Sequence, residues 1–289
     1  MPWKQFYLDE NGKHLFCNAH LAGRGAMNVV VTHTPVVSTV DIANYYAPLA
    51  QYGVNVFAFD FSGTGKSGGR EADFSRRTIV EDLDLLVEYV AGRFPGPINL
   101  YGSTGIGGIF AQYYVCQTDR IKSFAQFACL TYGETVGLGY PRWLVQALCP
   151  VLHWLPNMRL TMKPPKYTGF HQELDEAFYG EMLRLHPDFW RCSTKVTLAL
   201  LEMAVAGDSA FRRTVDIPTL VFQTMHDRYF SPAHFERYFA ALKGPKRLIR
   251  IDDVHNSYYI HSERFCKEVY TWFQEQADGP VLQREEIML

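Results

Sequence analysis

The stretch that decides the fold is Ile98-Asn99-Leu100-Tyr101-Gly102-Ser103-Thr104-Gly105-Ile106-Gly107-Gly108. An apolar run breaks into small residues and then restarts as a helical pattern over residues 109–115, which predicts a strand, a very tight turn and a helix. We expect the turn to hold its central residue in a strained backbone conformation, which small neighbours permit. A hydroxyl there would lie at a helix N-terminus, whose N–H groups can stabilise an oxyanion. The turn is therefore a candidate site for a nucleophile.

Strands alternate with helices on both sides of this turn. A hairpin is predicted from residues 2–9 and 14–21, because Asn11 and Gly12 at its centre favour a tight turn. Further strands are predicted at 29–32, 54–60, around 124–130, at 219–223 and at 248–251, and helices at 41–52, 76–93, 232–242 and 257–276. This alternation predicts a mostly parallel, doubly wound sheet of eight strands, with an antiparallel hairpin at its N-terminal edge and helices on both faces.

Residues 131–212 interrupt the alternation. The segment has a helical pattern and is rich in aromatic residues and prolines, and it is too long for a loop between two strands. We expect a core formed by residues 1–130 and 213–289, and a helical cap, or lid, formed by residues 131–212. Many of its aromatic side chains would fill the cap's own core, while their abundance predicts an apolar pocket beneath it, suited to an acyl chain or a ring system.

The turn and the order of elements resemble the α/β-hydrolase family over nearly the whole chain. The loop from Asp60 to Ser67 adds to the resemblance, because it is similar to the family's Asp-x-Arg-Gly-x-Gly-x-Ser loop, with Ser62 in place of the arginine. The resemblance implies an α/β-hydrolase-like sheet with a helical cap inserted after the sixth strand. It also implies a serine hydrolase (an esterase, a thioesterase or an acyltransferase) that acts on an ester, thioester or related acyl bond through a catalytic triad and an acyl-enzyme.

Acyl transfer on this fold needs a nucleophile, an acid and a histidine, in that order, at the ends of strands. His255 directly follows the last core strand of the predicted sheet and precedes the closing helix, as the catalytic histidine of the family does. Asp227 follows the preceding strand and is the predicted acid. His261 is a weaker alternative to His255. Asp252 and Asp253 precede the histidine directly in the sequence, so they are poorly placed to orient it.

The nucleophile has three candidate positions within the turn. The family pattern is small-x-nucleophile-x-small, and Ser103 has Gly105 at the correct place after it but the large Tyr101 before it. Thr104 has the small Gly102 before it and a bulky isoleucine after it. Gly105 has small residues on both flanks but no side chain. We predict Ser103, a primary hydroxyl, with Thr104 or an empty position as the alternatives.

Two backbone N–H groups would form the oxyanion hole that the resemblance implies. One belongs to the residue after the nucleophile, Thr104. The other belongs to the loop after the third strand, in the segment His33-Thr34-Pro35. Proline has no N–H to donate, so Thr34 is the predicted donor if the register places it there.

Composition excludes several other functions. The net charge of −2 and a pI near 6.5 give no electrostatic reason to expect nucleic acid as a partner. No His, Cys or Glu cluster has metal-ligand spacing, and the glycine-rich turns fit neither a dinucleotide nor a phosphate loop, so we expect no cofactor and no metal. No apolar run reaches ~20 residues, which argues against an integral membrane segment. The N-terminus lacks a signal-peptide pattern and the six cysteines lack C-x-x-C spacing, so we expect a cytoplasmic protein with reduced core thiols.

Two functions of different classes follow from these observations. The first is the acyl-bond hydrolase or acyltransferase with Ser103, Asp227 and His255, acting on an apolar small-molecule or acyl substrate. The alternative is a hydrolase-fold protein without acyl-enzyme chemistry, either a ligand-binding protein or a cyclase or lyase that uses His255 as a general base. Fold alone does not choose between them.

Overall fold

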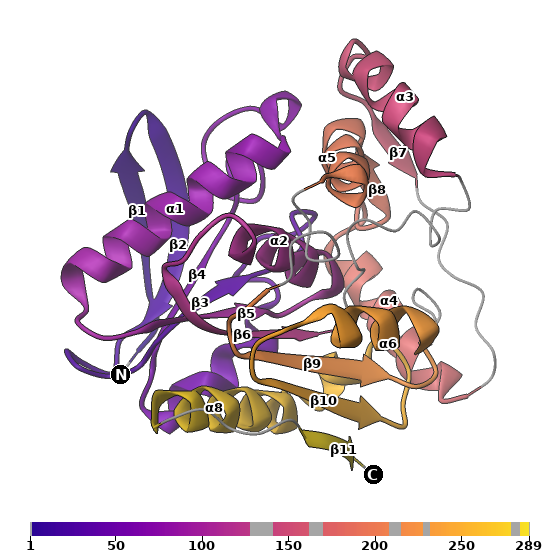
Figure 1. Ribbon diagram of the computed structural model, residues 1–289. Coiled ribbons are helices and arrows are strands. Elements are labelled where there is room, and N and C mark those ends of the chain that lie inside the picture. Colours follow the sequence, from indigo (N-terminus) through magenta and orange to yellow (C-terminus); the bar gives the residue numbers. More distant parts are fainter. Residues whose placement is uncertain are drawn as a thin grey trace.

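A single large sheet organises the computed structural model, which describes residues 2–127, 141–161, 170–207, 215–227, 232–278 and 284–288. The strand order is β1-β2-β4-β3-β5-β6-β9-β10-β11 (Figure 1). The strands are β1 Lys4–Glu10, β2 Lys13–His20, β3 Asn28–Thr32, β4 Asn55–Phe59, β5 Ile98–Gly102, β6 Ile121–Phe127, β9 Thr219–Thr224, β10 Lys246–Ile251 and β11 Arg284–Met288. The pairings among β3–β6 and β9–β11 are parallel, whereas β2 pairs antiparallel with β1 and β4. The eight predicted strands are confirmed, and β11 is an edge strand that the sequence analysis did not predict.

The N-terminal hairpin has the predicted turn. Asn11 and Gly12 have φ angles of 54° and 75°, both in the left-handed region. Two consecutive residues of this kind form the turn whose twist matches that of the flanking strands. The hairpin therefore follows from its local sequence.

Helices cover both faces of the sheet. On one face, α1 (Arg76–Arg93) packs beside α2 (Gly105–Val115), and on the other α8 (Ser262–Asp278) contacts β6 (Figure 1). A further helix, α6 (Pro232–Ala241), follows β9. The predicted closing helix is interrupted at His261, because α7 (Ser257–Ile260) ends one residue before it and α8 begins one residue after it.

The helix predicted over residues 41–52 is instead two short 3₁₀ helices. These are η1 (Ala43–Tyr45) and η2 (Ala47–Tyr52), and η2 contacts α8. Another 3₁₀ helix, η3 (Glu71–Asp73), precedes α1. Apolar spacing indicated the buried side correctly, since Tyr45 and Leu49 are buried, but it does not distinguish the two helix types over so few turns.

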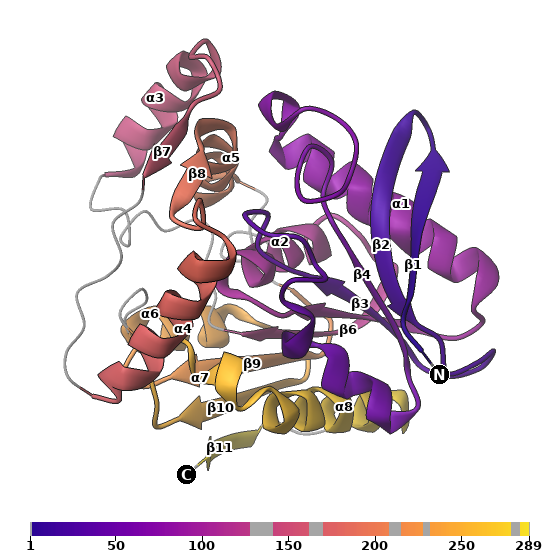
Figure 2. The same ribbon diagram turned by 180° about the vertical axis from the view of Figure 1, so that it is seen from behind.

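The segment between β6 and β9, here called the insertion, has the predicted helical character. It contains α3 (Arg142–His153), α4 (Gln172–Leu185) and α5 (Thr194–Val205), together with two short antiparallel strands, β7 (Arg159–Thr161) and β8 (Arg191–Ser193), as Figure 2 shows. The insertion's residues 128–140, 162–169 and 208–214 lie outside the described part of the chain.

Two aromatic residues of the insertion are exposed. Helix α3 packs against α5 through Val145, Cys149 and Leu198. Trp143 and Trp154 remain 68% and 90% exposed. The expectation that the aromatic side chains of this segment fill its core or line a pocket is therefore wrong for these two, because the buried side of α3 is occupied by smaller residues.

Candidate active site

The turn between β5 and α2 is sharp but its backbone is not strained. Thr104 is the N-cap of α2, with φ −137° and ψ 167°, an extended conformation. The only non-glycine residues with positive φ in the described chain are Asn11 and His171. The expectation of a strained centre in this turn is therefore wrong, since a helix N-cap normally adopts extended angles.

Small residues in the turn are required by close backbone contacts. A Cβ atom added at Gly102 would lie 2.5 Å from the Cα of Gly108, and one at Gly107 would lie 2.6 Å from the Cα of His33. These contacts bring β5, α2 and the loop after β3 together. Gly102 stands two residues before Thr104, which is the small position expected before a nucleophile at Thr104.

The two hydroxyls of the turn point to different partners. The Ser103 Oγ donates to the carbonyl oxygen of Thr32 at 3.0 Å, and its side chain is fully buried. The Thr104 Oγ1 accepts a hydrogen bond from the N–H of Gly107 at 3.0 Å. Among the described residues, these bonds lead to β3 and to the start of α2, and neither joins the hydroxyl to His255.

The predicted acid and base are hydrogen-bonded. The Nδ1 of His255 lies 2.6 Å from the Oδ2 of Asp227, whose side chain is fully buried. The same oxygen accepts a bond of 2.9 Å from the hydroxyl of Thr224, the last residue of β9. An Nδ1–H bound to a carboxylate leaves Nε2 as the basic nitrogen of the ring. The expected contact between Asp227 and His255 is confirmed.

Aromatic rings surround the imidazole. Phe127, at the end of β6, and Tyr258, in α7, lie with their ring centroids 6.1 Å and 5.7 Å from that of His255, both in edge-to-face arrangements. Burial raises the pKa of the Tyr258 phenol above its ordinary value, so this group is neutral near neutral pH. The histidine is therefore in a mostly apolar environment.

The weaker alternatives have other partners. Asp252 bonds to His226 at 2.8 Å, and Asp253 lies 3.1 Å from the Nδ1 of His171. His261 is half-exposed, 3.9 Å from Asp253. None of these contacts joins an acid to His255, whereas Asp227 is bonded to it.

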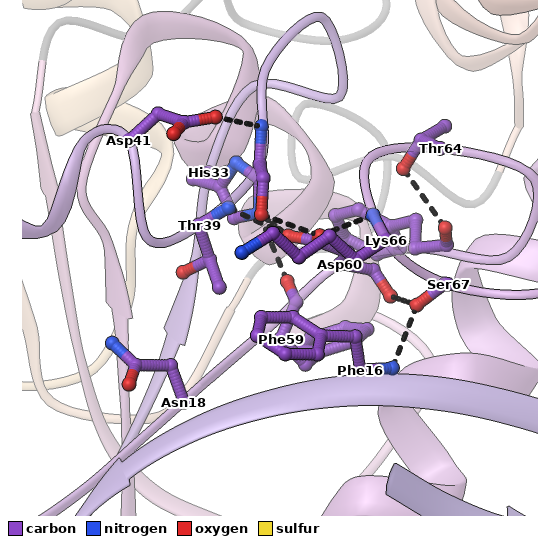
Figure 3. A network of polar contacts seen from close by, with 12 residues as sticks. Phe16, Asn18, His33, Thr39, Asp41, Phe59, Asp60, Thr64, Lys66 and Ser67 are labelled. Carbon is purple, nitrogen blue, oxygen red and sulfur yellow. Dashed lines mark hydrogen bonds and ion pairs between the residues drawn. The ribbon is translucent and has the colours of Figure 1, made fainter. Parts of the chain in front are cut away.

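The loop after β3 is fixed by the buried Asp60, the first residue of the Asp60–Ser67 loop that adds to the family resemblance. Asp60 accepts bonds from the Ser38 hydroxyl at 2.7 Å and from the N–H groups of Thr39 and Lys66 at 2.6 and 2.7 Å (Figure 3). The Nε2 of His33 lies 2.9 Å from the carbonyl oxygen of Phe59. These contacts hold both ends of the segment that contains Thr34.

His33 and Asp60 form a fully buried pair, with 3.3 Å between the Nε2 and the Oδ1. Burial alone would raise the pKa of Asp60, but the bonds from His33, Lys66 and Thr39 outweigh it and hold the pKa below its usual value. The carboxylate is therefore charged at neutral pH and acts as an acceptor for all of its donors.

A polar cavity lies where this loop meets the insertion. Its volume is about 180 Å³. Its lining includes Pro35, Val36, Thr64, Arg159, Asp188 and Arg191. The charged residues pair with one another and with Glu71, so this cavity differs from the apolar pocket predicted for the acyl group.

Neither a metal cluster nor a membrane-crossing helix is found in the described residues. No group of three His, Cys, Asp or Glu side chains there could hold a metal ion. No helix in the same ranges is long and apolar enough to span a bilayer.

Known proteins share this architecture. The sequence profile of the family described as serine aminopeptidase, S33, matches residues 26–255. The chain is similar to a monoacylglycerol lipase of Paleococcus ferrophilus, with 21% identity, a TM-score of 0.68 and coverage of 91% of this chain and 99% of the lipase. It is also similar to the α/β hydrolase GrgF from a Penicillium species, with 16% identity, a TM-score of 0.70 and coverage of 96% of this chain and 99% of GrgF. An enol-lactonase from Burkholderia xenovorans has 20% identity and a TM-score of 0.66, with coverage of 93% of this chain and 99% of the lactonase. No curated protein matches the chain. At these identities the solved structures show a shared fold.

Proposed function

We propose that this protein, which belongs to the serine aminopeptidase S33 family of α/β hydrolases, cleaves an ester, thioester or related acyl bond of an apolar small molecule. The observation that carries the proposal is the 2.6 Å bond between His255 and the buried Asp227. The bond joins the loops that follow β10 and β9, and the β5–α2 turn carries the hydroxyls that the chemistry requires. Hydrolysis and transfer to another acceptor share the first half-reaction.

In the proposed mechanism, a hydroxyl of the turn attacks the substrate carbonyl carbon while the Nε2 of His255 accepts its proton. Asp227 stabilises the imidazolium and keeps the ring in the required orientation. N–H groups at the start of α2 and in the loop containing Thr34 stabilise the oxyanion. The imidazolium then protonates the leaving group, and water or another acceptor releases the acyl group by the reverse sequence.

Ser103 is the proposed nucleophile and Thr104 the alternative. Ser103 carries the less hindered hydroxyl, but its bond to the Thr32 carbonyl has to break before its proton can pass to His255. Thr104 directly precedes α2 and follows Gly102 at the family spacing. A hydrogen bond from the Gly107 N–H lowers the basicity of its hydroxyl oxygen.

The test compares Ser103→Ala and Thr104→Ala in the turnover of a short-chain aryl ester. We expect Ser103→Ala to abolish turnover and to prevent labelling by a fluorophosphonate probe, with an unchanged circular dichroism spectrum. Loss confined to Thr104→Ala would move the nucleophile by one residue. Activity that survives both substitutions would exclude the covalent mechanism.

A function without an acyl-enzyme is the second candidate. The unstrained turn and the partners of both hydroxyls favour it, because they describe a site whose nucleophile is not directed at the base. Such a protein would bind a ligand, or use His255 as a general base in a cyclase or lyase. An unchanged intact mass after incubation of the folded protein with the fluorophosphonate would support this alternative.

A further inference from the structure

Three contacts connect the N-terminal part of α4, in the insertion, to the loops of the candidate site. Residues 226, 253 and 256 receive these contacts, and they flank Asp227 and His255 in the sequence. The contacts are a stack of Phe170 on His226 with centroids 3.6 Å apart, a 3.1 Å approach of His171 to Asp253, and a 2.7 Å bond from Asn256 to Asp175.

The contact between Asp175 and Asn256 is the most buried of the three. The two residues are 4% and 2% exposed. The Asn256 Nδ2 donates to the Oδ1 of Asp175, and Asn256 directly follows His255. Burying a carboxylate is costly unless hydrogen bonds compensate it. Burial raises the pKa of Asp175. The hydrogen bonds from Asn256 and the electrostatic interaction with the nearby His255 oppose this by lowering the pKa.

Backbone geometry at the start of α4 supports the same connection. His171, the N-cap, has φ 40° and ψ 38°, a left-handed conformation that is unusual for a residue with a Cβ. Its imidazole approaches the Oδ1 of Asp253, an oxygen that also accepts the N–H of Val254 at 2.7 Å. A conformation of this kind persists only where surrounding contacts enforce it.

We propose that Asp175 is a positioning residue for His255. Through Asn256 it fixes the loop of residues 252–256, so that the imidazole keeps its Nδ1 on Asp227 and presents its Nε2 toward the β5–α2 turn. This inference rests on the proposed function and deepens it, because a residue of the insertion then contributes to the geometry of the base. No step of the acyl transfer uses the Asp175 carboxylate directly.

The experiment measures kcat and KM of Asp175→Ala and Asp175→Asn with a short-chain aryl ester. We expect Asp175→Ala to lower kcat by about 10- to 100-fold with KM nearly unchanged, because a small misplacement of a catalytic group costs on the order of 10² in rate. Asp175→Asn should keep most of kcat, since its amide oxygen can still accept the bond from Asn256.

Glu181→Ala is the matched control. Glu181 lies on the same helix and accepts a bond from the Tyr259 hydroxyl at 3.3 Å, so its loss weakens the α4–α7 contact and leaves both partners of the Asp175–Asn256 bond in place. We expect wild-type kinetics for this variant. Asn256→Ala should reproduce the kcat loss, and its combination with Asp175→Ala should add little, as expected for two partners of one bond.

Three results would overturn the inference. These are full kcat in Asp175→Ala, an equal loss in Glu181→Ala, or a change confined to KM, which would make Asp175 part of the substrate wall. If Asp175→Ala does not fold, Asn256→Ala carries the same test. His255→Gln separates the two proposals. If His255→Gln is inactive and Asp175→Ala is fully active, the positioning role of Asp175 alone is excluded. If His255→Gln is active, the proposed function is excluded.

Discussion

Asp227 and Asp252 each bind a histidine through a hydrogen bond of similar length, but they bind different histidines. The Asp227 bond to His255 is 2.6 Å and fully buried on the acid's side, while the Asp252 bond to His226 is 2.8 Å and largely exposed. Only the buried pair can stabilise an imidazolium strongly, because water screens the exposed one.

We therefore predict that Asp227→Asn lowers kcat by about 10³- to 10⁴-fold, because an amide can no longer select the required tautomer and stabilise the imidazolium. Asp252→Asn is the control and should leave kcat within about twofold. The measurement is the turnover of an aryl ester by both purified variants, with thermal unfolding to check the fold. Equal losses in the two variants would contradict the assignment of Asp227.

At the residue scale, the sequence indicated the positions of residues that follow strand ends better than the side-chain orientations inside the β5–α2 turn. His255 and Asp227 follow β10 and β9, so the strand order alone brings them to one edge of the sheet. The orientation of Ser103 depends on the Thr32 carbonyl, which is 71 positions away in the chain. No local pattern contains that contact.

At the scale of elements, short-range signals predicted the regular pieces well. Helix α1 has the bounds that its periodicity predicts, and Ser75 and Thr78 form a capping box at its start. The strand β11 was missed, because its segment, Arg284–Met288, is recognised as a strand by its pairing with β10, which lies more than 30 residues away in the chain. Its charged composition carries no strand signal.

Asp60 joins the loop after β3 to the loop after β4, and its charge leads to a prediction about how stability depends on pH. The folded-state pKa of Asp60 is depressed below its usual value of 3.8, so the carboxylate contributes stability that is fully present above the unfolded-state pKa. This contribution is lost as the pH falls through the lower, folded-state value. The free energy of unfolding of the wild type should therefore decrease below about pH 4.

Asp60→Asn should lower the free energy of unfolding at pH 7 by about 3 kcal/mol, because an amide has one acceptor oxygen in place of the two carboxylate oxygens that bind Ser38, Thr39 and Lys66. The variant should also lose the part of the acid dependence that Asp60 supplies. Urea unfolding at several pH values between 3 and 7 measures both effects. Asp73→Asn, an exposed partner of Arg70, is the control. If the free energy of unfolding of Asp60→Asn decreased toward acidic pH as much as that of the wild type, the role of Asp60 would be contradicted.

At the scale of the whole molecule, the core was predictable and the packing of the insertion was not. The core follows from alternating strands and helices, a pattern that few topologies satisfy. Helix α3 leaves the apolar Leu148 and Val151 exposed and buries Val145, so its apolar positions do not indicate which side is buried. Trp143 and Trp154 are exposed, while Phe178 and Tyr179 of α4 are buried.

The buried aromatic residues of α4 and the rings beside His255 lead to a prediction about substrates. Phe178 packs edge-to-face on Tyr259 with centroids 4.9 Å apart, and Phe127 lies beside the imidazole. If these surfaces face the acyl group, each buried methylene contributes up to ~0.8 kcal/mol. We predict that kcat/KM rises several-fold for every two carbons added to the acyl chain, until the pocket is full. A series of 4-nitrophenyl esters from acetate to decanoate measures this, and Trp154→Ala, which changes an exposed ring, should leave the profile unchanged. A flat profile in the wild type would mean that these aromatic side chains serve only packing, and it would favour the ligand-binding alternative.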